Sequence, residues 1–317
     1  MNDELLSKLA IVIPCYNEAA VLPAMAPVFI DKLKALVDAS KISKESYLLF
    51  VDDGSSDETW SIIKKLAAAD AHIHGISLSR NRGHQNALLA GLEYVMDNAD
   101  AVISADCDGQ DDLDAIDEMV DKYRKGAEVV YACRNSRETD TWFKRTSAEL
   151  FYRMIRWMGG EVIFNHADFR LASRRVVQGL SRFREVNLFL RGMFPLVGYK
   201  SAKVYYSRKE RVSGQSHYPF FKMLNFAVDG ITSLSVRPIR MIAVCGAVVT
   251  FVSFMLFIWA ICAHCMGNPV PDGTSNIVCV MFIGGVQLLS LGVIGEYIGK
   301  IYLETKNRPR YIVAEQV

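Results

Sequence analysis

The sequence predicts an α/β protein with a doubly wound, mostly parallel sheet, followed by amphipathic juxtamembrane helices and two C-terminal transmembrane helices. Short apolar runs alternate with helical stretches over residues 9–132, a pattern typical of parallel sheets covered by helices on both faces. Near the C-terminus, two long stretches contain no Asp, Glu, Lys or Arg, as expected of helices that cross a bilayer. The net charge of +1 gives no sign of a nucleic-acid partner.

The predicted elements follow one another in a regular order. Five short apolar runs are interpreted as strands, at residues 9–13, 47–51, 73–78, 101–105 and 128–132. Apolar residues at helical spacing predict helices between them, at 23–39, 59–69, 85–96 and 113–123. Ligands of such sheets bind beyond the carboxyl ends of the strands. Acidic clusters follow two of these strands, so we expect a functional site at that edge.

The first acidic cluster is the pair Asp52 and Asp53, which ends the second predicted strand and precedes Gly54. Two adjacent carboxylates can accept hydrogen bonds from ribose hydroxyls or from a base N–H, and glycine lets the backbone approach a ligand closely. The structural alternative is that Ser56 or Asp57 caps the next helix. Capping does not require the adjacent pair, so this loop is predicted to contact a nucleotide.

The second acidic cluster, Asp106 and Asp108, leaves the fourth predicted strand. Two carboxylates at this spacing can approach one hard cation, and Mg²⁺ typically binds one or two carboxylates together with substrate phosphates. Such a cation neutralises a diphosphate leaving group. Isolated acidic pairs are common in loops. This one follows a strand and has a second acidic pair on another strand end, which favours a site for Mg²⁺ or Mn²⁺.

The two uncharged stretches, 241–265 and 273–295, each exceed the roughly 20 residues that cross a bilayer as a helix. Basic residues flank both stretches, so the positive-inside rule places both ends in the cytoplasm. Residues 206–240 interleave basic and aromatic side chains, as at a membrane interface, although an ordinary mixed surface is the alternative. The predicted order is a cytosolic catalytic domain at 1–205, a juxtamembrane segment at 206–240, the spans at 241–265 and 273–295 with an external link at 266–272, and a cytosolic tail at 296–317.

Glycines in and after the second stretch predict association within the membrane. Small residues let transmembrane helices approach closely. We therefore expect a homo-oligomer at the cytoplasmic (inner) membrane, with a tetramer as one candidate, through glycines 284, 285, 292, 295 and 299.

Several motifs give this chain a resemblance to a known family. Residues 13–18, 51–59 and 106–111 resemble the motifs of family 2 inverting glycosyltransferases with a GT-A fold. Residues 168–170, 191–193, 206–216 and 294–302 are similar to the polyprenyl-phosphate branch, which includes bacterial undecaprenyl-phosphate glucosyltransferases and dolichol-phosphate mannose synthases. The resemblance covers nearly the whole chain. One departure is the stretch 112–114, which lacks the prolines that many members carry.

The resemblance implies a metal-dependent hexosyltransferase that moves one sugar from a nucleotide-sugar to undecaprenyl or dolichyl phosphate. By position, it implies nucleotide-sugar contacts at Pro14, Tyr16, Glu18, Asp52, Asp53, Asp106 and Gln110. It implies metal binding at Asp106 and Asp108, and catalytic roles for Asp168, Asp108 and Asp111. It implies contacts with the phosphates or the acceptor at Arg191, Arg208, Arg211, Ser213, Gln215 and Ser216.

Asp168 occupies the position treated as the catalytic base in related enzymes. A lipid phosphate is already an anion near neutral pH, so positioning and electrostatics should supply much of the rate. We therefore expect Asp168 to act as a base or as a group that orients the acceptor, the alternative being an ion pair with Arg170. His84 begins a predicted helix, and it either contacts the donor or makes local hydrogen bonds.

UDP-glucose is the donor we expect, because the overall pattern is nearest to the bacterial glucosyl branch. GDP-mannose, a UDP-N-acetylhexosamine and a modified arabinose stay open. A processive polysaccharide synthase is a second hypothesis, but it usually has more spans and a Gln-x-x-Arg-Trp motif, which this sequence lacks. A catalytically dead membrane scaffold is a third, and the complete acidic set argues against it.

Overall fold

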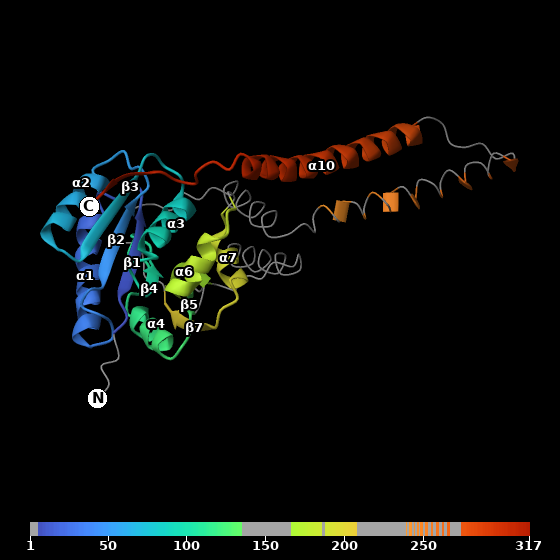
Figure 1. The fold of residues 1–317 in the computed structure, drawn as a ribbon. Helices are drawn as coiled ribbons and strands as arrows, with labels where there is room; N and C mark the ends of the chain where they lie inside the picture. Colours follow the sequence, from blue (N-terminus) through green and yellow to red (C-terminus); the bar gives the residue numbers. More distant parts are fainter. Residues whose placement is uncertain are drawn as a thin grey trace.

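The computed structural model describes residues 6–134, 166–185, 188–207 and 274–317, together with scattered residues between 239 and 266. Its strands are β1 (Leu9–Cys15), β2 (Tyr47–Asp52), β3 (Ile73–Leu78), β4 (Ala101–Ser104), β5 (Val129–Arg134), β6 (His166–Ser173), β7 (Ser201–Tyr206) and β8 (Val313–Gln316). They form one eight-stranded sheet in the order β7-β5-β6-β4-β1-β2-β3-β8, with β8 at the edge beside β3 (Figure 1).

The sheet is mixed, with a parallel centre. Strands β4, β1, β2 and β3 pair in parallel, and the register places Cys15 of β1 opposite Asp52 of β2. β6 runs antiparallel to both β4 and β5, β7 runs parallel to β5, and β8 runs antiparallel to β3. Only β6 and β8 therefore run against the other described strands. The parallel centre brings the carboxyl ends of β1 to β4 to one edge, where both acidic clusters begin.

Helices cover both faces of this sheet (Figure 1). They are α1 (Leu22–Asp38), α2 (Thr59–Ala69), α3 (His84–Val95), α4 (Ala115–Arg124), α6 (Arg174–Ser181) and α7 (Leu190–Leu196), with α10 (Thr274–Thr305) extending away from the sheet. Ile11 and Ile13 of β1 belong to a core shared with α1 and α4, whereas Ala10 and Val12 belong to a second core shared with α3, α6 and α7. Both faces of β1 are buried, which explains its unbroken apolar run.

The sequence-based elements are confirmed over residues 9–132, where every predicted strand and helix is present with boundaries shifted by a few residues. The apolar helix α10 continues to Thr305, ten residues beyond the predicted end of the second span, and Lys300 and Glu296 pair on it with 3.8 Å between Nζ and Oε1. Within the described residues, the stretch Phe282–Thr305 is one candidate membrane span. Of the predicted span 241–265 only scattered residues are described, so a second span stays a prediction.

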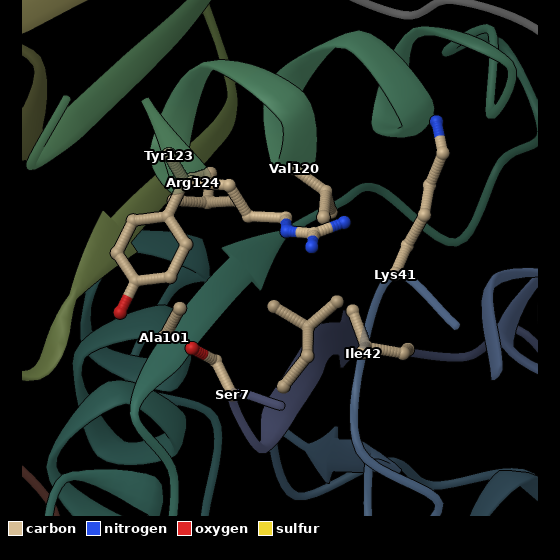
Figure 2. A pocket seen from close by; sticks show the side chains of 9 residues that line it. Ser7, Lys41, Ile42, Ala101, Val120, Tyr123 and Arg124 are labelled. Carbon is tan, nitrogen blue, oxygen red and sulfur yellow. The ribbon is translucent and has the colours of Figure 1, made fainter. Parts of the chain in front are cut away.

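Two hollows lie at the amino ends of the strands, away from the acidic loops. The smaller, of about 10 Å³, is bounded by Val120 and Tyr123 of α4 and by Ile42 (Figure 2). This is room for at most about one water molecule. The larger, of about 310 Å³, is lined by polar side chains that include His72 and His74. The predicted functional edge is at the opposite ends of these strands.

The packing of α3 on the sheet makes Gly91 sensitive to added bulk. A Cβ at this position would lie 2.3 Å from Cγ1 of Val12 and 2.8 Å from Cγ2 of Val51, both on buried strands. We expect Gly91→Ala to lower the free energy of unfolding by about 1–3 kcal/mol, the usual cost of overpacking a core. Denaturant unfolding of the purified protein measures this. Ala68→Val, on the exposed surface of α2, is the control and should cost less than about 1 kcal/mol. Equal stability of the Gly91 variant and the wild type would contradict the close packing.

Candidate active site

The loops that follow β1, β2 and β3 are fastened to one another at the carboxyl edge of the sheet. Asn17, with a φ of 54°, accepts a hydrogen bond from the backbone N–H of Ser56 at 2.9 Å, and its own N–H donates to Oγ of Ser55 at 2.9 Å. Gly54 has a φ of 65°, and a Cβ there would lie 2.5 Å from the carbonyl carbon of Arg80. Glycine is therefore required where the second loop crosses the third.

The first acidic pair is bound into this edge. Asp52 accepts a hydrogen bond from Oγ of Ser77 at 2.7 Å and another from the N–H of Ser55 at 3.1 Å. Asp53 accepts from the backbone N–H groups of Arg82 and Gly83, at 2.7 and 2.8 Å. Burial raises the pKa of Asp53, although these two hydrogen bonds oppose the shift. Asp53 thus fixes the loop after β3, whereas Asp52 joins its own loop to β3. Nucleotide contact by this pair stays a prediction.

The second acidic pair follows β4 as predicted. Asp108 accepts a hydrogen bond from the N–H of Gln110 at 3.1 Å, which turns the chain around Gly109 with a φ of 69°. Desolvation raises the pKa of Asp106; His84 opposes this shift, and the carboxylates of Asp168 and Asp108 add to it. The carboxylates of Asp168 and Asp108 are thus near enough to Asp106 to disfavour its ionised form, and a bound cation would offset this repulsion. The pair therefore fits a divalent metal on electrostatic grounds.

Asp168, on β6, is held between two arginines. Arg191 of α7 donates from Nε and Nη2 to the two carboxylate oxygens of Asp168, at 3.2 and 2.9 Å. Nη2 of Arg170 donates to the same carboxylate, and Arg170 is only 1 % exposed. Burial by itself raises the pKa of Asp168, but the charges of Arg191 and Arg170 outweigh it and hold the pKa far below its usual range. The two arginines therefore favour the ionised form of Asp168.

His84 lies between Asp106 and Asp168. Its Nε2 lies 3.7 Å from Oδ1 of Asp106 and 3.8 Å from Oδ2 of Asp168. It is the first residue of α3, and the side-chain oxygen of the next residue, Gln85, accepts the N–H of Leu190 at 3.0 Å. The start of α3 thus lies close to Asp106 through His84 and contacts α7, which carries Arg191, through Gln85.

Asp111 is held by a residue of β7, the strand at one edge of the sheet. It is buried, and Oδ1 accepts a hydrogen bond from the hydroxyl of Tyr206, at the end of β7, at 2.7 Å. Tyr206 in turn makes an edge-to-face contact with Phe169 of β6, with ring centroids 5.6 Å apart. The carboxylate therefore has a fixed position within the loop that also carries Asp106 and Asp108.

The structure brings together the predicted residues on the strand ends. Pro14 is buried in β1, Tyr16 is 47 % exposed beside it, and the N–H of Glu18 donates to Oγ1 of Thr59 at 2.9 Å. The remaining predicted phosphate and acceptor residues lie outside the described residues: Arg208, Arg211, Ser213, Gln215 and Ser216. Their proximity to the site stays a prediction.

Two residues of the site were not predicted as its members. The sequence analysis considered Arg170 only as an alternative ion-pair partner of Asp168. The spacing of the two residues is the signal that could have placed Arg170 in the site, because residues two apart on a strand point to the same face. Tyr206 gave no such signal: its partner Asp111 lies 95 residues earlier in the chain, and only the pairing of β7 with β5 brings it near.

Comparisons with known proteins give a consistent result. The model of glycosyl transferase family 2 matches residues 10–180, and the model of the GtrB C-terminal hairpin matches residues 237–301. The uncharacterized glycosyltransferase YkoT of Bacillus subtilis strain 168 is 45 % identical over 305 residues, which cover 96 % of this chain and 90 % of that protein. Bactoprenol glucosyl transferase of Shigella phage SfX is 40 % identical over 308 residues, which cover 96 % of this chain and 98 % of that protein.

A solved structure with similarity to this chain is glucosyl-3-phosphoglycerate synthase from Mycobacterium tuberculosis, crystallised with Mn²⁺, UDP-glucose and phosphoglyceric acid. The two share 18 % sequence identity and superpose with a TM-score of 0.46, over 72 % of this chain and 78 % of the other.

Removing the charge of Asp168 should affect both stability and activity. In Asp168→Asn the buried Arg170 loses its counter-ion, and breaking such a pair costs about 3–5 kcal/mol. Adding Arg170→Leu should restore part of the stability without restoring activity, because the unpaired charge is gone but Arg191 still lacks its partner. Denaturant unfolding and a transfer assay measure the two effects. A stable, active Asp168→Asn variant would contradict the structural role given to this cluster.

The same cluster predicts an acid dependence. Because the pKa of Asp168 is lower in the folded than in the unfolded state, its stabilising contribution is complete above about pH 5 and is lost progressively below about pH 4. Unfolding free energies measured between neutral pH and pH 3 should fall more steeply for the wild type than for Asp168→Asn. Parallel curves would show that this carboxylate is not held ionised by its arginines.

Proposed function

Because this chain belongs to glycosyltransferase family 2, we propose that it transfers one glucosyl group, with inversion, from UDP-glucose to a polyprenyl phosphate at the cytoplasmic face of the membrane. The observation that carries this proposal is the 40 % identity to a bactoprenol glucosyl transferase, which extends over 96 % of this chain and 98 % of that protein. The match to the GtrB C-terminal hairpin model at residues 237–301 supports the same substrate class, since it extends beyond the catalytic sheet.

The metal part of the proposal depends on Asp106 and Asp108. Among the described residues, no group of three or more His, Cys, Asp and Glu side chains could hold a metal by itself. A site with two carboxylates suits Mg²⁺ or Mn²⁺ that takes its other ligands from water and substrate phosphates. When bound, the cation would neutralise the charge that develops on the departing diphosphate. The neighbouring carboxylates of Asp108 and Asp168, which add to the raised pKa of Asp106, support this assignment.

The acceptor part depends on the positive groups around Asp168. A lipid phosphate arrives as an anion, so the chain needs to position it more than to remove a proton. The side chain of Arg191 is 30 % exposed, and Asp168 fixes its guanidinium by accepting two hydrogen bonds from it. We infer that Asp168 acts as an orienting group for Arg191 and the acceptor, because its lowered pKa makes it a weak base.

The membrane part depends on the apolar helix α10. Its stretch Phe282–Thr305 is long and apolar enough to span a bilayer, and large apolar side chains such as Leu288 and Leu291 are 72 % and 63 % exposed. Exposed apolar surface of this extent is explained by burial in lipid or against another helix. A second span and an oligomer joined through these helices are part of the same proposal.

The metal assignment is tested by neutralising Asp108. We expect Asp108→Asn to lower the transfer rate by at least about 100-fold, since a lost charge contact in the transition state costs several kcal/mol. Asp114→Asn is the matched control, because Asp114 lies on the same loop but its exposed side chain pairs with Lys32 at 2.8 Å. Transfer by both variants is measured with Mg²⁺, with Mn²⁺ and with a chelator. A wild-type rate in the Asp108 variant, or in the chelator, would argue against a metal site and in favour of another arrangement.

The substrates are tested by direct product analysis. Purified protein in detergent with Mg²⁺ receives undecaprenyl phosphate and one donor at a time: UDP-glucose, GDP-mannose, UDP-N-acetylglucosamine or UDP-4-amino-4-deoxy-arabinose. Mass spectrometry should find a single hexose on the lipid, formed from UDP-glucose. A polymer would instead support a processive synthase. Absence of any lipid-linked product from all four donors would support a catalytically inactive scaffold.

A further inference from the structure

The end of the chain returns from the apolar helix to the catalytic sheet. After α10 ends at Thr305, Asn307 turns the chain with a φ of 45°. Strand β8 then pairs antiparallel with β3, and the last residue, Val317, exchanges two backbone hydrogen bonds of 2.9 Å with Gly75. Figure 1 shows the C-terminus beside α2 and β3, at the opposite edge of the sheet from β7. We call residues 306–317 the tether.

Side chains hold the tether at two places. On α2, Nε1 of Trp60 donates to Glu315 at 2.7 Å, and Nζ of Lys64 lies 3.5 Å from the same carboxylate. Nearer α10, Nη2 of Arg310 donates to the carbonyl of Phe183 at 3.0 Å, and the hydroxyl of Tyr311 bonds the carboxylate of Glu93 on α3. These contacts involve four separate parts of the catalytic domain: β3, α2, α3 and the segment after α6.

The strand itself adds little to the core. All four residues of β8 are exposed, so burial of apolar side chains does not explain why the chain end is bound so completely. Its partners instead belong to the elements that build the donor site. β3 leads into the loop whose amides hold Asp53, and α3 begins with His84. The tether therefore connects the apolar helix mechanically to the donor side of the active site.

The connection is short. Arg310, the first residue held on the catalytic domain, follows the end of α10 by five positions. Even a fully extended chain of that length spans at most about 18 Å. The catalytic domain therefore cannot move far from the end of α10 while the tether is bound.

We propose that the tether sets the distance and orientation of the active site relative to the bilayer, so that the phosphate of a membrane-embedded lipid reaches the site beside Arg191. This inference rests on the proposed function. A covalent link of fixed length raises the effective concentration of the membrane-bound acceptor at the site, and that gain falls as the link is lengthened. An acceptor that dissolves in water needs no such link.

The experiment lengthens the tether in the full chain. A flexible eight-residue Gly-Ser segment is inserted between Asn307 and Arg308, which preserves every contact of β8 while adding up to about 28 Å of reach. The control variant carries the same eight residues appended after Val317, where they add no slack. Both are assayed with undecaprenyl phosphate in phospholipid vesicles and with a short, water-soluble prenyl phosphate, and UDP affinity is measured in the presence of Mn²⁺.

We expect the insertion to lower transfer to the vesicle-bound acceptor at least about fivefold, and to change the rate with the soluble acceptor and the UDP affinity by less than about twofold. The appended control should match the wild type with both acceptors. Equal rates for the insertion variant and the wild type in vesicles would overturn the proposal. An equal fall with both acceptors would also overturn it, since the tether would then act on the donor site itself. Absence of transfer by the wild type to either acceptor would instead count against the proposed function.

Discussion

The carboxylate of Asp168 between Arg170 and Arg191 is the interaction that holds β6 and α7 together at the candidate site. Arg170 is enclosed: it stacks on Phe194, with 4.4 Å from its Cζ to the ring centroid, and Asp168 supplies the negative charge that makes its burial tolerable. Arg191 and Phe194 both belong to α7. The cluster therefore fixes the short helix α7 to β6 and, by the same contacts, holds the partly exposed guanidinium of Arg191 beside Asp168. Removing the charge of Asp168 leaves the buried guanidinium of Arg170 without compensation.

The parallel centre of the sheet was predictable because its signal is local. β1 and β2 are buried on both faces, and their unbroken apolar runs alternate with amphipathic helices. β6 and β8 gave no comparable signal. β6 contains Asp168 and Arg170 within its buried run, and its antiparallel direction depends on pairing with β4 and β5. β8 consists of four exposed residues, so no apolar pattern distinguishes it from the tail that we expected there.

The site was predictable to the extent that its residues lie at strand ends. The carboxyl edge of a parallel sheet is the known place for ligands, and this located Asp53, Asp106 and Asp108 without tertiary information. Their partners could not be located in this way. Asp53 accepts hydrogen bonds from backbone amides that lie 29 and 30 residues later in the chain. Asp168 is held by Arg191, which lies on a helix and follows it by 23 residues. Such contacts depend on how helices and loops pack, which the spacing of residues along the chain does not specify.

The pairing of β3 with β8 has a consequence for biosynthesis. Until residues 313–316 are translated, the outer edge of β3 has no strand partner among the described strands, and an open strand edge is a template for pairing with other chains. By that point the apolar helix α10 has already been synthesised. The catalytic sheet is therefore completed only after the hydrophobic segment has left the ribosome, so a nascent chain stalled before membrane insertion would still present an unprotected β edge.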